Sequence, residues 1–303
     1  MEEREPVAID DANIVTSAPA STPARGTVSR RLGVGVAGAG LIGAVHARSV
    51  RLAGATLAGV ATSSPERSRE AAERLGAEKA YATPEQPATA DDVGHVCTPD
   101  PDLGGPSRAF ADIGSHWCDL VEFMTGDRIE AICAQTSTVF AERGARGAAR
   151  AFEVADGNGG RHRRVTTEDA VTAPFRIANG AHGTRIVSQV SPGRKNHLHV
   201  EIACADAGVR SEQERPEMLW LGRREGTETV WRDPGTLAAR LAVAPAGHPQ
   251  GYLDCFDLMV ADSYAAIAGE APEGLPTFAD GARSAHLIDA VLASATSAGW
   301  VEV

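Results

Sequence analysis

Three polar residues, Asp112, His116 and Asp119, are separated by four and three positions within an expected helix that Pro106 and Gly126 bracket. In a regular helix these spacings place all three side chains on one face. A carboxylate beside an imidazole positions and tunes a histidine that transfers protons, so this pattern indicates acid–base chemistry. An exposed helix face linked by ion pairs gives the same pattern, and spacing alone favours this simpler interpretation.

A second chemical pattern, G-A-G-L-I-G at residues 38–43, directly follows the apolar run 34–37. A G-x-G-x-x-G turn between a buried strand and a helix is typical of dinucleotide binding, whereas a glycine-rich turn without ligand is the alternative. Gly38 permits the turn, Gly40 lets a pyrophosphate approach the backbone, and Gly43 lets the helix pack closely on the strand. The expected cofactor contacts of the turn and the first helical amides are Gly38, Gly40, Leu41, Ile42 and Gly43.

The end of the second expected strand bears on the choice of cofactor. NAD-binding turns commonly carry a carboxylate on the ribose about 20 residues after the glycines, but Thr62 and Ser63 stand here instead. Arg67, one helical turn further, suits the 2′-phosphate of NADP, although an ordinary solvated helix residue is a slightly simpler interpretation. NAD and NADP therefore both stay open, with Arg67 favouring NADP. Thr98 and Pro99, at a later strand end, complete the expected cofactor contacts.

The elements that must position these residues alternate between strands and helices. Ser64 and Pro65 signal a helix start and Gly76 a helix stop. The alternation predicts a parallel, doubly wound α/β sheet that binds ligands at the carboxyl ends of its strands. The expected strands cover residues 34–37, 55–61, 80–82 and 93–97, and the expected helices cover 44–52 and 64–75.

After Glu130 the pattern changes to antiparallel strands. Asn179-Gly180 is a strong hairpin signal, and the resulting open sheet is expected to offer one face to a second subunit. His197 and His199 share a strand face, but no metal site is expected because no carboxylate or thiol stands at suitable spacing. The expected strands are 132–140, 169–177, 183–190, 197–203 and 218–222, followed by helices at 252–268 and 280–296.

Composition narrows the class of protein. With 303 residues and 43% hydrophobic side chains the chain is globular, and its net charge of −11 argues against nucleic-acid binding. It has no apolar run long enough to span a membrane. Five cysteines without a C-x-x-C pair favour the reducing cytoplasm. The expected division is a disordered tail at 1–30, a partial dinucleotide-binding domain at 31–103, and a substrate and oligomerisation domain at 104–303.

Four motifs together resemble the glucose–fructose oxidoreductase, inositol dehydrogenase and rhizopine catabolism (Gfo/Idh/MocA) family. They are G-V-A-G-A-G-L-I-G-A-V-H-A at 35–47, H-V-C-T-P at 95–99, D-I-G-S-H-W-C-D at 112–119 and P-T-F-A-D-G at 276–281. The resemblance implies a Rossmann domain followed by an α/β domain whose open sheet carries oligomer contacts. It also implies NAD(P)-dependent oxidation or reduction of sugars and cyclitols. His116 would then transfer the proton and Asp112 would place the substrate.

The sequence departs from this family after Thr98 and Pro99. In the family a helix, a fifth strand and an E-K-P motif follow, and the lysine of that motif supports the nicotinamide and catalysis. This chain contains no E-K-P, and its only lysines, Lys79 and Lys195, match neither the motif nor its place. The resemblance thus implies an internal deletion that keeps the adenosine end of the cofactor site and removes most of the nicotinamide end.

The function expected from these observations is an NAD(P)-dependent oxidoreductase of the sugar or cyclitol dehydrogenase type. It would act on a polyol or sugar-like substrate with His116 as acid and base, at an activity impaired by the missing segment. One alternative is a non-catalytic member that binds a nucleotide or a partner. The other is a redox-neutral or lyase-type enzyme that uses Asp112, His116 and Asp119.

Overall fold

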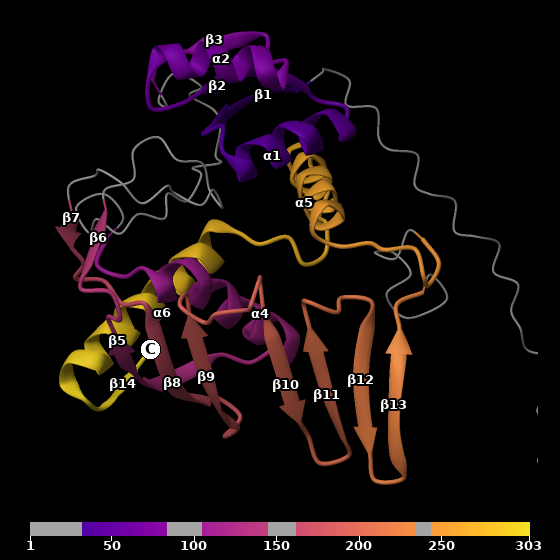
Figure 1. Cartoon of the computed structure of the whole chain (residues 1–303). Coiled ribbons are helices and arrows are strands. Elements are labelled where there is room, and N and C mark those ends of the chain that lie inside the picture. Colours follow the sequence, from indigo (N-terminus) through magenta and orange to yellow (C-terminus); the bar gives the residue numbers. More distant parts are fainter. Residues whose placement is uncertain (1–31, 84–104, 145–161, 234–243) are drawn as a thin grey trace, which may run out of the picture.

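The computed structural model describes residues 32–83, 105–144, 162–233 and 244–303 (Figure 1). The first elements of the described part form a three-stranded parallel sheet. Its order is β1-β2-β3, and the parallel α/β arrangement expected from the sequence is confirmed. The expected strand at 93–97, together with Thr98 and Pro99, lies outside the described residues. The elements are β1 (Gly33–Ala37), α1 (Leu41–Leu52), β2 (Thr56–Ala61), α2 (Pro65–Leu75) and β3 (Lys79–Tyr81).

Local signals set the bounds of α2 closely. The Ser64 hydroxyl accepts a hydrogen bond from the Arg67 amide at 3.3 Å, and Pro65 occupies the first helical position. Gly76 ends the helix at φ +64°, a conformation that favours glycine. Helix α1 was expected from residue 44 but begins at Leu41, because Gly43 lies inside the first turn rather than before it.

The antiparallel strands divide between two main sheets. One has the order β14-β4-β8-β5 with β9 paired to β8, and the other has the order β10-β11-β12-β13. The hairpin at Asn179-Gly180 is confirmed: it joins β8 to β9, with Gly180 at φ +89°. The bounds are β4 (Ile129–Cys133), β5 (Gln135–Ser137), β8 (Ala170–Ile177), β9 (His182–Ser188), β10 (His199–Ala203), β11 (Ala207–Glu212), β12 (Met218–Arg223), β13 (Gly226–Trp231) and β14 (Trp300–Glu302).

Two expectations for this region were wrong in detail. The strand expected at 132–140 is two elements, β4 and β5, which pair one after the other along the same edge of β8, while β9 pairs with its other edge. Strands β11 and β13 were not expected. A further two-stranded ribbon joins β6 (Glu142–Gly144) to β7 (His162–Arg164).

Helices cover one side of the five-stranded sheet. A π-helical segment, η2 (Phe110–Gly114), leads directly into α4 (Ser115–Thr125), and α6 (Phe278–Ser297) packs beside α4 (Figure 1). The main core lies between these helices and the sheet and contains Phe110, Ile129, Ile132, Val171, Phe175, Leu287 and Val291. The sheet and its two covering helices therefore hold the segment that carries Asp112 and His116.

Helix α5 (Tyr252–Ile267) ties the two parts of the chain together by packing on α1. The Asp257 carboxylate accepts hydrogen bonds from Arg48 at 2.6 and 2.7 Å and from the buried Ser49 hydroxyl at 2.6 Å. Figure 1 shows α5 between the parallel sheet and the antiparallel sheets. None of the helices in the described ranges combines the length and apolar character needed to cross a membrane. The proposed domain boundaries stay a prediction.

Candidate functional site

The glycine loop has the geometry that its sequence predicts. Gly38 adopts φ +98°, and its amide donates to the Ala61 carbonyl at the end of β2 at 2.8 Å. A Cβ on Gly43 would collide with the Gly38 carbonyl, so the helix can approach the turn only through glycine. A Cβ on Gly40 would meet nothing within 4 Å. The surface over Gly40 is therefore open to a ligand.

The amino terminus of α1 is left available for an anion. Gly40 is the N-cap and provides no side-chain hydrogen bond, and the first turn carries no acidic residue. The side chains of Leu41 and Ile42 are 47% and 40% exposed, so they do not bury the first turn. Unsatisfied amides and the positive end of the helix dipole both favour a phosphate group here. The residues present fit the pyrophosphate of a dinucleotide.

Two glycine substitutions separate folding from ligand binding at this loop. Gly43→Ala is expected to destabilise the protein by about 1–3 kcal/mol, because the added carbon meets backbone. Gly40→Ala is expected to leave the melting temperature unchanged but to weaken NAD(P) binding at least about tenfold, because the methyl group occupies the approach of the pyrophosphate. Calorimetry of both variants measures both effects. Equal nucleotide affinity in Gly40→Ala and wild type would contradict a phosphate site over this glycine.

The residues expected at the adenosine ribose split into two groups. Thr62 is used locally: its amide donates to the Ser68 hydroxyl at 2.9 Å and its hydroxyl to the Ser64 carbonyl at 3.2 Å. Arg67 and Ser63 are both exposed, and the Arg67 guanidinium donates to the Ser63 hydroxyl at 3.1 Å. The structure thus brings Ser63 and Arg67 together at the surface beyond β2.

Arg74 is a further basic residue at the loop that sequence reasoning missed. Its guanidinium donates to the Ala39 carbonyl at 2.7 Å and so holds the glycine loop against α2. Its spacing could have identified it. Arg74 lies seven residues after Arg67, so two turns of α2 bring both side chains to the same helix face, the one that Arg67 was expected to turn toward the cofactor.

The segment with Asp112 and His116 differs from the helix that was predicted. The helical segment begins near Phe110 rather than at Pro106, and Asp112 lies in its π-helical part while His116 lies in the first turn of α4. Regular α-helical spacing therefore does not apply between them. The Asp112 carboxylate accepts a hydrogen bond from Gln189, just after β9, at 2.9 Å. The His116 side chain is exposed to solvent.

Asp119, one turn after His116, lies among other carboxylates. Burial raises the pKa of Asp119, and the negative charges of Asp280 and Glu122 raise it further, whereas His116 opposes this shift. The structure therefore couples His116 electrostatically to Asp119, while Asp112 is tied to Gln189.

Arg185 of β9 fixes the π-helical segment to the sheet and was not identified from the sequence. Its guanidinium is buried, donates to the carbonyls of Ile113 (3.1 Å) and Gly114, and lies 4.9 Å from the ring centre of Phe110. Burial lowers the pKa of Arg185 to about 10, which leaves it charged at neutral pH. A Cβ on Gly114 would come 2.5 Å from the Phe110 ring, which explains the glycine of the D-x-G-x-H pattern.

Two buried carboxylates before β8 hold the start of this segment. Glu168 accepts hydrogen bonds from the Ser107 hydroxyl at 2.8 Å and from the amides of Arg108 and Phe110 at 2.9 Å each. Asp169 is fully buried and forms an ion pair with Arg108. Sequence analysis placed Asp169 at a strand start without assigning it a role.

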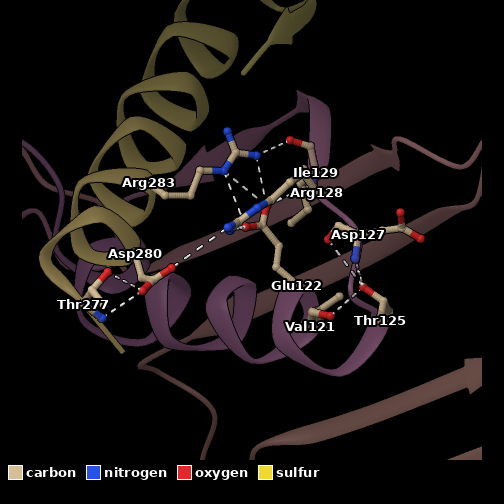
Figure 2. Close-up of polar contacts among 9 residues, drawn as sticks. All are labelled: Val121, Glu122, Thr125, Asp127, Arg128, Ile129, Thr277, Asp280 and Arg283. Atoms are coloured by element: carbon tan, nitrogen blue, oxygen red, sulfur yellow. Dashed lines mark hydrogen bonds and ion pairs between the residues drawn. The ribbon is translucent and has the colours of Figure 1, made fainter. Parts of the chain in front are cut away.

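A second polar network, centred on the buried Glu122, joins α4 to α6 and to the start of β4 (Figure 2). Glu122 accepts hydrogen bonds from Arg283 at 2.9 Å, from Arg128 at 2.6 Å and from the Ile129 amide at 2.9 Å. Asp280 accepts from the amide and the hydroxyl of Thr277, both at 2.8 Å, as a cap for α6. The P-T-F-A-D-G motif therefore starts a helix and places Asp280 near Asp119.

The comparisons with known proteins agree with this arrangement. A family model, the GFO/IDH/MocA C-terminal domain, matches residues 85–210. The levoglucosan dehydrogenase of Pseudarthrobacter phenanthrenivorans (strain DSM 18606 / JCM 16027 / LMG 23796 / Sphe3) is 31% identical over 205 residues, which are 65% of this chain and 52% of the relative. The chain thus spans about half the length of this curated relative.

Solved structures share the fold at lower identity. A levoglucosan dehydrogenase in complex with NADH and L-sorbose is 20% identical, with a TM-score of 0.75 over 90% of this chain and 99% of that one. An oxidoreductase domain protein from Kribbella flavida is 22% identical, with a TM-score of 0.71 and the same coverage. The family model, the curated relative and the shared fold lead to one conclusion: residues 85–210 match the C-terminal domain of the GFO/IDH/MocA family, and the chain has the fold of these solved oxidoreductases.

Proposed function

We propose that this protein is an NAD(P)-dependent oxidoreductase that acts on a sugar, polyol or cyclitol. The observation that carries the proposal is the glycine loop at residues 38–43, whose Gly40 is uncovered and whose first helical turn has no side-chain cap, in a chain whose residues 85–210 match a GFO/IDH/MocA C-terminal domain. The levoglucosan dehydrogenases with which the chain is compared include complexes with NADH and a sugar, which supports a similar substrate class here.

The cofactor contacts follow from the described residues. The amides of Leu41, Ile42 and Gly43 would hold the pyrophosphate, and Ser63 and Arg67 would face the adenosine ribose. When bound, the nicotinamide would accept a hydride from the substrate or return one. The exposed guanidinium of Arg67, with no carboxylate at positions 62 and 63, favours NADP over NAD.

Arg67→Ala is expected to raise the dissociation constant of NADP about tenfold while leaving that of NAD nearly unchanged, since only NADP carries the 2′-phosphate that the guanidinium would meet. The matched control is Arg69→Ala, which removes an arginine of the same helix that pairs with Glu66. Fluorescence titration with both cofactors makes the comparison. An equal effect on NAD and NADP would refute the role assigned to Arg67.

The chemical step is assigned to the segment that Arg185 anchors. During oxidation the exposed imidazole of His116 would take the proton of the reacting hydroxyl, and it would return the proton during reduction. Asp112, oriented by Gln189, would accept a hydrogen bond from a substrate hydroxyl and so place the sugar. Asp119 would add negative charge beside His116.

Turnover is proposed to be impaired, because the chain offers no equivalent of the E-K-P lysine. Lys79 lies in β3, and Lys195 lies just before β10, where its amide bonds to Glu214. Hydride transfer depends on close positioning of cofactor and substrate, so loss of a supporting charge costs rate rather than adenosine binding. This same absence favours the second candidate function, a non-catalytic nucleotide-binding member of the family.

One experiment distinguishes these functions. The purified chain is titrated with NAD and NADP by calorimetry, then assayed at 340 nm with levoglucosan, L-sorbose and a set of inositols. Cofactor binding with substrate-dependent NAD(P)H formation supports the oxidoreductase. Binding with no absorbance change across the set favours the non-catalytic member. Product formed without net NAD(P) reduction would instead support the redox-neutral or lyase-type activity of Asp112, His116 and Asp119.

We further propose that the four-stranded sheet carries contacts between copies of the chain. Strands β12 and β13 keep large side chains at least partly exposed, and Trp231 is 51% exposed. Exposed apolar surface of this kind is typical of protein interfaces. Light scattering of the purified chain measures the oligomeric state directly, and a monomer at micromolar concentration would exclude this proposal.

A further inference from the structure

Three side chains with metal-binding atoms meet beside β10 and β11. The His197 Nδ1 atom lies 3.6 Å from the Glu212 Oε1 atom and 3.4 Å from the Glu214 Oε2 atom. Among the described residues these three form the one group of histidine, cysteine and carboxylate ligands compact enough to hold a metal ion, with donor atoms within 4.8 Å of one another. The side chains of His197, Glu212 and Glu214 are 24%, 31% and 27% exposed, and Glu214 taken as a whole residue is exposed.

The strand register explains why these residues meet. His199 pairs with Glu212 across the antiparallel ladder, and the Gln213 amide continues the ladder by donating to the Leu198 carbonyl at 2.8 Å. Two residues further on each strand, His197 therefore opposes Glu214. Side chains two positions apart share a strand face, so H-x-H on one strand confronts E-x-E on the other. The sequence predicted no metal site because no carboxylate or thiol stands at suitable spacing, whereas the strand register brings two carboxylates to His197 from elsewhere in the chain.

The distances suit a transition metal ion. Tetrahedral zinc with ligand bonds of about 2.0–2.1 Å separates its ligand atoms by about 3.3–3.4 Å. The two distances from His197 are already within a few tenths of an ångström of this value. Imidazole with carboxylates is also a ligand set that divalent zinc, cobalt and manganese accept.

The Glu214 carboxylate is oriented by the backbone. Its Oε1 atom accepts a hydrogen bond from the Lys195 amide at 2.8 Å, which leaves the Oε2 atom directed toward His197. Such contacts to the distal oxygen of a ligand fix its orientation and raise metal affinity. The His199 ring stacks on that of His197, with centroids 5.9 Å apart.

Arg194 is a cation that would compete with a metal ion for Glu214 and His197. Its guanidinium lies 3.5 Å from Glu214 and 3.5 Å from His197, and its side chain is 56% exposed. Without a metal, Arg194 supplies part of the positive charge that two neighbouring carboxylates require. Because the side chain is exposed and long, it can turn into solvent when an ion takes its place.

From this geometry we propose that His197, Glu212 and Glu214 bind one divalent transition metal ion, with Zn²⁺ as the representative. The ion fastens the turn at residues 191–196 to the end of β11. A water molecule or His199 completes its coordination. This site is independent of the glycine loop and of His116, so the proposal does not rest on the oxidoreductase activity.

The test is metal titration of the full chain after treatment with a chelator. Co²⁺ is followed by its visible absorption and Zn²⁺ by calorimetry, with circular dichroism and melting temperature recorded for every variant. We expect one equivalent to bind, and His197→Ala and Glu214→Gln to weaken binding at least about tenfold. His182→Ala, which removes an exposed imidazole of β9, is the matched control and is expected to bind as wild type does.

Arg194→Met separates a metal site from an ordinary ion-pair network. If the cluster binds a metal, removing the competing cation tightens binding about 3- to 10-fold. If it serves only as an ion-pair network, Arg194→Met lowers the melting temperature and leaves metal affinity unchanged. The proposal is overturned by that second result, by the absence of a one-to-one complex in wild type, or by equal affinities in His197→Ala, Glu214→Gln and His182→Ala.

Discussion

Glu122→Ala is expected to lower the free energy of unfolding by about 3 kcal/mol, the lower end of the range for breaking a buried ion pair. The Glu122 side chain is only 4% exposed and satisfies Arg283, Arg128 and the Ile129 amide together (Figure 2). Removing it leaves the Arg283 guanidinium, 20% exposed, without its carboxylate partner. The cost stays near the lower end because Arg128, 58% exposed, remains hydrated.

Chemical denaturation at neutral pH measures this loss. The matched control is Glu302→Ala, which removes the exposed partner of Arg176 and is expected to cost less than about 1 kcal/mol. If the two variants lose the same stability, the Glu122 network does not support the fold as described.

The pH dependence of stability provides a second measurement on Glu122. Burial alone would raise the pKa of this carboxyl, but hydrogen bonds from Arg283, Arg128 and the Ile129 amide outweigh burial and lower it. A lowered folded-state pKa contributes stability that is fully present above the unfolded value of about 4.3. That contribution disappears as the pH falls through the folded-state pKa. Glu122→Gln should therefore lose less stability than wild type between neutral and acidic pH.

His116→Ala is expected to reduce the rate of NAD(P)H formation at saturating substrate by about 10²–10⁴-fold, the usual contribution of a positioned acid–base group. Cofactor affinity should stay unchanged, because the glycine loop lies on β1 and α1 while His116 lies on α4. The His116 side chain is exposed, so its removal leaves no buried cavity and little change in stability is expected.

Steady-state rates and cofactor titration, measured together, test this assignment. His286→Ala, on α6, removes a histidine outside the proposed machinery and serves as the control. Turnover that survives in His116→Ala would assign proton transfer to another group and would contradict the mechanism proposed for this segment.

Short-range signals predicted much of the fold. The Ser64-Pro65 start and Gly76 stop of α2, and the Asn179-Gly180 hairpin, each depend on backbone angles and caps within a few residues, which sequence reports directly. Strands β11 and β13 were missed because their sequences, A-G-V-R-S-E and G-T-E-T-V-W, have few apolar residues and little burial. Such strands form through pairing with neighbours rather than through an alternating pattern.

The site was less predictable, because its contacts join residues far apart in the chain. The glycines at 38, 40 and 43 could be assigned roles from sequence, since each role is local. Arg185 could not, because a buried arginine in a strand is recognised only when its partners, the carbonyls of Ile113 and Gly114, are placed beside it. The meeting of His197 with two glutamates likewise depends on strand register.

The π-helical segment η2 (Phe110–Gly114) has a further consequence for how this chain tolerates insertions and deletions. A π turn accommodates an extra residue within a continuous helix. Excising one residue there would restore regular α-helix and change the directions of the side chains within the turn, while α4 kept its place. Asp112, which lies within the π turn, would lose its present orientation toward Gln189, while His116 in α4 would keep its place. The length of this short segment, rather than side-chain identity alone, sets the relative orientation of the two proposed functional groups.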